Sequence, residues 1–323
     1  MNALALCARI VWLACCGIAF AHAQIQAYPV KPLRIIVTST PSSGPDIMAR
    51  LIGQKLTEAW GQQVVVDARA GASGTIGAEI AARSAPDGYT LVIGTSQWAI
   101  VAAMFSKLSY SMTRDFLPVS LIASTPFLLV VNPAVPASSV PELIALLKSR
   151  PGEIRYGSGG SGSPPHLAAE IFKSMTATDM MHVPYKGVTP ALVDTLGGQV
   201  QLTFAVIPAV LPMIRSGKVR ALGVTSARRT ALVPDLPAIA EFVPGYEFIG
   251  WYGLLAPART PEAILAKLNA EVVNALKTPE LRERLAGLGA EPIGSTRAEL
   301  ASFIATQLEK MHKAVETSGA HIE

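Results

Sequence analysis

Cysteine is almost absent from this sequence, and its three positions are informative. Cys7, Cys15 and Cys16 all precede residue 24, so residues 24–323 contain no thiol. That part of the chain can form no disulfide and offers no thiolate as a nucleophile or metal ligand. Its stability must then come from a hydrophobic core, and 50% hydrophobic residues in a chain of 323 are enough to build one.

Charge is also scarce, at 15% of the residues, and neither sign dominates. Removing residues 1–23 takes away Arg9 alone, which leaves 26 basic residues against 23 acidic ones and a net charge of +3. No basic run interleaved with aromatic residues occurs. An excess this small and dispersed argues against a nucleic-acid partner.

Catalytic and metal-binding patterns are missing as well. No G-x-S-x-G elbow and no G-x-x-x-x-G-K-[ST] phosphate loop occurs. None of the histidines beyond residue 23 has a second ligand at metal-binding spacing, which argues against a metal site; they are His166, His182, His312 and His321. A Ser-His-Asp triad built from distant segments stays open. No poised acid–base pair is visible, so we expect a protein that is not an enzyme and needs no cofactor.

The N-terminus has the features of an export signal. Arg9 precedes an apolar stretch over residues 10–20, and Ala21-His22-Ala23 gives an A-x-A cleavage pattern. We therefore predict a signal peptide over residues 1–23, cleaved after Ala23, and a periplasmic protein. A transmembrane anchor is disfavoured because it needs about 20 apolar residues. Ala14-Cys15 weakly resembles a lipoprotein box, but Trp12 stands where a small aliphatic residue belongs.

Apolar runs alternate with helical patterns along most of the chain. Residues 46–60 are spaced for one helical face between two such runs. Repeated β-α-β alternation predicts an α/β fold with mostly parallel sheets covered by helices. The predicted strands lie at residues 33–37, 63–66, 90–94, 127–131, 154–156, 180–183, 201–205, 219–225 and 248–255. Turn residues beside 127–131 and 248–255 suggest a chain that leaves one lobe, builds a second and returns.

Helix starts carry their own signals. Thr260-Pro261 and Thr278-Pro279 each place an N-cap residue before proline at the first helical position. Thr296 and Glu299 form a predicted capping box. The apolar stripe that follows predicts a core-facing helix; it consists of Leu300, Phe303, Ile304, Leu308, Met311 and Val315.

Four glycine- and serine-rich loops each follow a predicted strand. They span residues 40–44, 70–74, 94–96 and 157–163. Glycines let backbone amides converge, and a following helix presents unpaired N–H groups, so such loops suit a carboxylate. Gly157–Gly162 also fits G-x-G-x-x-G, but no acidic residue follows the next strand, so an anion-binding loop is favoured over a dinucleotide site or a plain turn.

Several segments in order resemble the Bug (Bordetella uptake gene) family, the periplasmic receptors of tripartite tricarboxylate transporters. They include Tyr28-Pro-x-Lys-Pro-Leu-Arg-Ile-Ile-Val, Arg69-Ala-Gly-Ala-Ser-Gly, Ala85-Pro-Asp-Gly-Tyr-Thr-Leu, His182-Val-Pro-Tyr-Lys-Gly and Gly250-Trp-Tyr-Gly. The resemblance implies a two-lobed periplasmic-binding-protein fold of type II, each lobe a mostly parallel sheet flanked by helices. The expected boundaries are 24–130 and 246–323 for the first lobe and 131–245 for the second.

By position, the resemblance implies contacts to a ligand carboxylate from loop amides, hydroxyls and water. The implied ligand-binding residues are Ser42, Ser43, Asp46, Ala72, Ser73, Thr95, Ser96, Ser158, Ser163, His166 and Lys186, with Tyr185 and Gly187 beside them. From the residues alone, a structural alternative is open at three of these positions. Asp46 could serve simply as a helix cap, His166 as a packing residue and Lys186 as a solvated side chain. One departure stands out: Ser42 and Ser43 occupy positions where the family has two glycines.

The expected function follows from the resemblance and from the missing catalytic groups. We expect a monomer that captures a small carboxylate-containing solute in an inter-lobe cleft and delivers it to membrane transporter subunits. The alternative is a ligand-loaded sensor that signals to a membrane kinase. The sequence leaves the identity of the carboxylate open.

Overall fold

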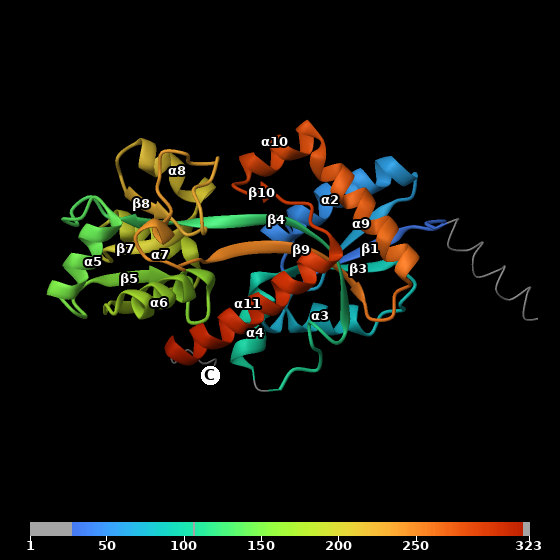
Figure 1. The fold of residues 1–323 in the computed structure, drawn as a ribbon, viewed down its shortest axis with the longest axis horizontal. Helices are drawn as coiled ribbons and strands as arrows, with labels where there is room; N and C mark the ends of the chain where they lie inside the picture. The colour runs from blue at the N-terminus through green and yellow to red at the C-terminus, as the bar shows by residue number, and fades with distance from the viewer. Residues whose placement is uncertain (1–27, 106, 319–323) are drawn as a thin grey trace, which may run out of the picture.

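Two long strands run antiparallel through the middle of the molecule and connect its two halves (Figure 1). They are β4 (Phe116–Val131) and β9 (Ile249–Pro257). The computed structural model describes residues 28–105 and 107–318, so the predicted signal peptide and its cleavage after Ala23 lie outside the described residues. The strands join one ten-stranded sheet in the order β2-β1-β3-β9-β4-β7-β5-β6, with β8 and β10 also paired to β4.

The first half contains three parallel strands that alternate with helices, as the periodicity predicted. The strands are β1 (Leu33–Val37), β2 (Val64–Ala68) and β3 (Thr90–Thr95), with β1 between the other two. The elements between and after them are α2 (Gly44–Trp60), the 3₁₀ turn η1 (Ala72–Gly74), α3 (Thr75–Ala82) and α4 (Ser96–Met104).

The second half repeats this arrangement with a second set of parallel strands. The strands are β5 (Arg155–Ser158), β6 (Met181–Pro184), β7 (Leu202–Val206) and β8 (Arg220–Val224), of which β5 is parallel to β6 and β7. The helices are α5 (Val140–Ser149), α6 (Pro164–Thr176), α7 (Val188–Leu196), α8 (Ile207–Arg215) and the short η2 (Ile239–Glu241).

The C-terminal elements pack mainly on the first half. They are α9 (Glu262–Lys277), α10 (Pro279–Gly287), β10 (Glu291–Pro292) and α11 (Arg297–Ser318). The α11 stripe is buried as predicted, but along its length it joins two different cores. Leu300 and Ile304 pack with Trp98, whereas Met311 and Val315 pack with the core of the second half. Helix α11 therefore bridges the halves (Figure 1).

One of the helix-start predictions holds in detail, one holds in position only and one is wrong. Thr296 and Glu299 exchange the expected bonds, with Glu299 N donating to Thr296 Oγ1 at 3.2 Å and Thr296 N donating to the Glu299 carboxylate at 2.8 Å. Thr278 stands at the N-cap position of α10, but its hydroxyl donates to Ala275 O at 2.7 Å and makes no capping bond. Thr260 does not cap α9, because its hydroxyl donates to Pro257 O at 2.8 Å and the helix begins at Glu262. Over residues 28–105 and 107–318, no helix is both long and apolar enough to span a bilayer.

Candidate functional site

The parallel strands of both halves end near the middle of β4. Thr95, the last residue of β3, pairs with Tyr252 of β9, which in turn pairs with Ala123 of β4. Val206, the last residue of β7, pairs with Phe127 of β4. The ends of β3 and β7 are therefore level with Ala123 and Phe127 of β4. These two residues are four positions apart, or about 13 Å along the strand. Loops at the carboxyl ends of α/β strands are where such folds place their ligands.

Three of the predicted loops meet at Thr38, the first residue after β1. The Trp98 indole on α4 donates to Thr38 Oγ1 at 3.0 Å. Gly74 packs so closely that a Cβ there would lie 3.1 Å from the same oxygen. The loops after β1, β2 and β3 are therefore held together by one buried threonine, which is only 8% exposed.

Backbone strain is concentrated in these loops. Ser42, Ala72 and Ser73 adopt left-handed conformations with φ of 63°, 47° and 55°. Among the described residues only two other non-glycine positions, Ala177 and Arg259, have positive φ. A left-handed non-glycine residue costs about 1–3 kcal/mol and tends to persist at functional sites. The serine that replaces a family glycine at position 42 thus keeps the glycine-like conformation.

Asp46 holds the strained turn at Ser42 in place. Its buried carboxylate accepts a hydrogen bond from Ser42 N at 3.0 Å and from Arg50 Nε and Nη2 at 2.9 and 3.1 Å. The hydrogen bonds from the Arg50 guanidinium and the Ser42 amide lower the pKa of Asp46 despite its burial. The carboxylate at this position therefore stabilises the loop and the start of α2.

The first half still offers hydroxyl groups without an internal partner. Ser73, Thr95 and Ser96 donate no side-chain hydrogen bond within residues 28–105 and 107–318, and Ser73 is exposed. Ser43 is already committed, because its Oγ lies 2.6 Å from Ser39 Oγ. The open hydroxyls thus belong to the loops after β2 and β3.

Tyr252 lies beside these loops and forms a side-chain hydrogen bond with Thr125; no local pattern in the sequence predicted a role for it. The side chain of Tyr252 reaches Gly44 at the start of α2, where a Cβ would lie 2.4 Å from the tyrosine hydroxyl. Burial raises the pKa of Tyr252, so the hydroxyl stays protonated and can donate. Gly250-Trp-Tyr-Gly was part of the family pattern, but only the β3–β9 register shows that Tyr252 lies level with Thr95.

The predicted loop after β5 uses most of its donors internally. Ser158 is fully buried, and its Oγ lies 2.6 Å from His182 Nε2 and accepts from Gly160 N at 3.1 Å. Ser163 Oγ donates to Gly160 O at 2.7 Å. Gly162 N donates to His166 Nδ1 at 3.1 Å. Ser163 is followed by Pro164 and Pro165, which carry no N–H and so offer no backbone donor.

A stack of three rings supports this loop from inside. The His182 ring packs nearly parallel to both Tyr156 and His166, with centroid distances of 4.9 and 4.1 Å, and those two rings lie 6.4 Å from each other. Burial, followed by the neighbouring His166 and Lys173, lowers the pKa of His182 to about 4. Burial likewise lowers the pKa of His166. Both imidazoles are therefore neutral at pH 7. No local sequence pattern indicates that the two rings would stack.

The remaining predicted residues lie beside the start of α7. Lys186 is exposed and makes no ion pair or hydrogen bond with the described part of the chain. The Tyr185 hydroxyl donates to Asp194 Oδ2 at 2.6 Å, so it is engaged within the second half. Gly187 has a φ of 122° and is the N-cap of α7.

Next to these residues is a small apolar pocket of about 70 Å³ at the end of β7. It is lined by residues from β4, β7, α6, α7 and α8: Phe127, Pro165, Val188, Thr189, Leu192, Thr203, Phe204, Ala205, Val206 and Ala209. The only polar side chains among them are two threonines. This pocket gives the second half a surface unlike the hydroxyl-rich loops of the first.

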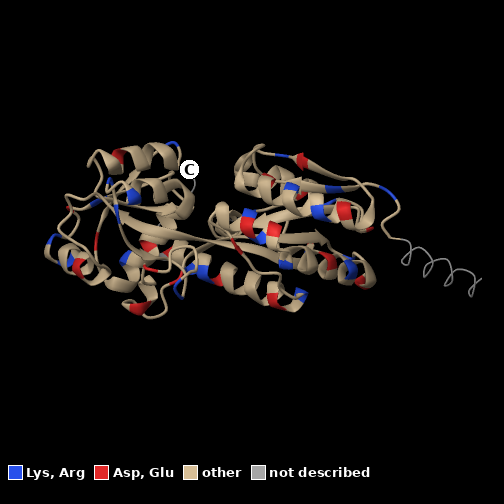
Figure 2. Cartoon of the chain, turned by 90° about the horizontal axis from the view of Figure 1, so that it is seen from above, with Lys and Arg blue, Asp and Glu red and all other residues tan. Residues whose placement is uncertain are grey.

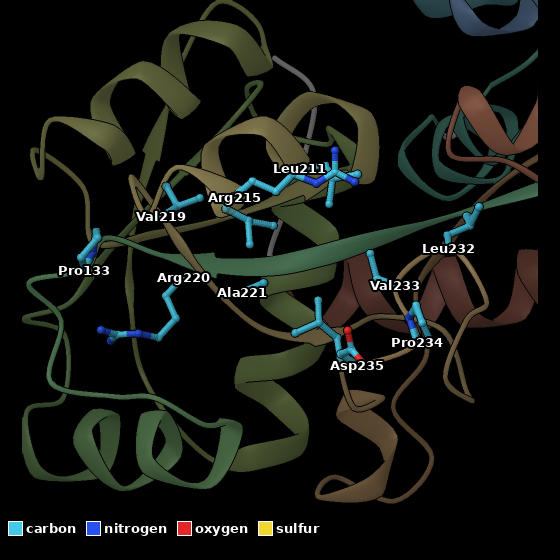
Figure 3. Close-up of a pocket in the computed structure, with 13 residues that line it drawn as sticks. Pro133, Leu211, Arg215, Val219, Arg220, Ala221, Leu232, Val233, Pro234 and Asp235 are labelled. Carbon is cyan, nitrogen blue, oxygen red and sulfur yellow. The ribbon is translucent and has the colours of Figure 1, made fainter.

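A separate cavity of about 620 Å³ lies farther out in the second half (Figure 3). It is lined by the last turn of α8, the start of β8 and residues 232–236. Arg215 and Arg220 point in different directions in Figure 3, and Arg220 donates to Ala137 O at 3.0 Å. The start of β8 pairs with Val131 at the far end of β4, away from the strand ends. The C-terminus of a helix also disfavours an anion.

Charge and metal-binding groups do not point to another kind of site. Figure 2 shows Lys and Arg interspersed with Asp and Glu over both halves. No group of three or more His, Cys, Asp or Glu residues within the described ranges could hold a metal ion.

Comparison with known proteins agrees with this geometry. Residues 48–320 match the tripartite tricarboxylate transporter family receptor (TctC). Protein BugT of Bordetella pertussis is 37% identical over the full length of both chains. A structure titled R. palustris Rpa4515 with adipate is 37% identical with a TM-score of 0.76, covering 91% of this chain and 99% of that one. MatC from Rhodopseudomonas palustris with bound malate is 32% identical with a TM-score of 0.72, covering 89% and 100%.

These matches confirm the predicted fold class and the family resemblance. The fold of two halves, each with parallel strands flanked by helices, matches that of the periplasmic binding protein BugD, which is 28% identical with a TM-score of 0.73. The chain therefore belongs to the TctC family of tripartite tricarboxylate transporter receptors, which includes the Bug proteins.

Proposed function

We propose that this protein captures a small carboxylate between its two halves in the periplasm and delivers it to the membrane subunits of a tripartite transporter. The observation that carries the proposal is the junction at Thr38, where strained loops present free hydroxyls at the strand ends. Relatives of at least 32% identity hold adipate and malate. The receptor family favours a transporter partner over a sensor kinase.

The proposed binding site consists of the eleven residues expected from the family, which have different roles in it. Ala72 and Ser73 with Thr95 and Ser96 contact the carboxylate through amides and open hydroxyls. Ser42, Ser43 and Asp46 fix the first loop. Ser158, Ser163 and His166 fix the loop after β5, and Lys186 stands at its rim. The proposed lobes are 24–130 with 246–323, and 131–245, in a monomer that begins after Ala23.

We expect Ser73→Ala and Ser96→Ala each to weaken adipate binding about ten- to hundredfold. Each change removes one hydrogen bond to a charged group, worth about 1.5–3 kcal/mol. Isothermal titration calorimetry on the purified protein measures the loss. Arg69→Ala is the control, because Arg69 pairs with Asp67 at the end of β2. If Arg69→Ala abolished binding while both serine variants bound normally, a guanidinium clamp would replace the proposed hydroxyl contacts.

A further inference from the structure

The two sides of the proposed site differ in character. At the strand ends of the first half, Ser73, Thr95 and Ser96 offer open hydroxyls. In the second half, the residues at the starts of α7 and α8 are valines. Val188 is 53% exposed and Val206 is 37% exposed. Exposed valines at such positions are unusual because helix N-termini usually favour anions and polar groups.

The helix starts of the second half are also poor in amide donors. Pro190 follows Val188 in the first turn of α7, and Pro208 lies at the start of α8. Proline carries no N–H, so each helix has fewer free donors for an anion. The loop after β5 commits two of its three serine hydroxyls, because Ser158 lies against His182 and Ser163 donates to Gly160 O, which leaves only the exposed Ser161 open.

The apolar pocket lies between these two helix starts. Val188, Leu192, Val206 and Ala209 line it, and Phe127 of β4 contributes to its wall. Phe127 is level with the end of β7, about 13 Å along β4 from the level of Thr95. A ligand that spans this distance would present one end to hydroxyls and the other end to aliphatic carbon.

We infer that the physiological ligand is a monocarboxylate with an apolar body. Its carboxylate binds the loops after β2 and β3, and its alkyl or aromatic end enters the pocket between α7 and α8. A second carboxylate at that end would lose its water against valine side chains without gaining a partner. This inference rests on the proposed capture of carboxylates and specifies their class.

The competing arrangement places a second carboxylate at Lys186. This lysine is exposed next to Gly187 and has no partner among the residues that the structure describes. A dicarboxylate held there would depend on the Lys186 charge, whereas a monocarboxylate with an apolar end would depend on Val188. The two arrangements therefore predict opposite effects of substitution at neighbouring positions.

The test uses hexanoate and adipate, which have the same chain length and differ only in one terminal carboxylate. Calorimetry on the full purified chain should show hexanoate binding at least about tenfold more tightly. Val188→Asn should weaken hexanoate about tenfold, because it places an amide against the alkyl end. Val193→Asn is the matched control: Val193 is 57% exposed on the same helix but does not line the pocket.

Tighter binding of adipate, lost in Lys186→Ala and retained in Val188→Asn, would overturn the inference while leaving the receptor function intact. Equal weakening by Val188→Asn and Val193→Asn would also overturn it, since the effect would then not come from the pocket. Failure of both acids to bind would contradict the proposed carboxylate capture itself.

Discussion

Trp98→Ala is expected to lower the free energy of unfolding by about 3–5 kcal/mol, the usual cost of deleting a buried aromatic side chain. Trp98 is 1% exposed and packs edge-on or tilted against Tyr110 and Phe116 at centroid distances of 5.6 and 5.2 Å. Its indole also donates to Thr38 at the junction of the three loops. Urea unfolding followed by circular dichroism gives the change in stability.

A matched pair of Trp→Phe variants separates the hydrogen bond from the packing. Trp98 and Trp251 are both 1% exposed, but Trp251 Nε1 has no acceptor within the described residues. Trp98→Phe should therefore cost about 1–3 kcal/mol more than Trp251→Phe, the cost of leaving Thr38 without its donor. Only Trp98→Phe should also weaken adipate binding. Equal losses of stability and affinity in both variants would show that the Thr38 bond does not organise the loops.

The sequence predicted the strands best where they are buried on both faces. The run at residues 33–37 has the same bounds as β1, and residues 90–94 fall one short of β3. Such strands are continuous apolar runs between turn signals, so their limits are visible without tertiary information. Because each glycine-rich loop follows a strand, its place at the strand ends was predictable too.

The sequence could not predict contacts that depend on the register of paired strands from distant segments of the chain. His182 meets Ser158 and stacks on Tyr156 only because β5 and β6 are parallel with Tyr156 opposite His182. A shift of one residue would turn His182 to the other face of the sheet. Tyr252 was missed for the same reason, since its position beside Gly44 depends on the pairing of β3 with β9.

Local sequence patterns also could not predict how the two halves pack against each other. The α11 stripe correctly predicted burial, but helical periodicity cannot show that its ends enter different cores. Helix α4 behaves similarly: Trp98 belongs to the first half, whereas Ala99 and Ile100 pack into the core of the second. Contacts of Gly162 with Met104 at the end of α4 connect the halves again. A lobe boundary at residue 130 therefore agrees better with the order of the strands than with the packing of the hydrophobic cores.

Stability is expected to fall by about 1–2 kcal/mol as the pH decreases from 7.5 to 4.5, mainly because of His182. Its pKa is lowered to about 4 from an ordinary value of 6.5, first by burial and then by His166 and Lys173. Between these two values the unfolded chain binds a proton that the folded chain does not, so acidification favours unfolding. His166 acts in the same direction, although Glu170 opposes the lowering of its pKa. His182 is partly exposed, and solvent screening reduces the effect below the about 2.5 kcal/mol that the full shift would give.

Urea unfolding of His182→Gln at the same pH values should show a much flatter profile, since glutamine can bond Ser158 but does not titrate. The remaining slope would come from His166. His312→Gln changes an exposed histidine on α11 and should keep the wild-type profile. Paired carboxylates such as Asp46 and Asp115 also have lowered pKa values, but their contribution is lost mainly below about pH 4.5, outside this window. If His182→Gln lost stability as steeply as the wild type, the buried histidine stack would not be the source of the acid sensitivity.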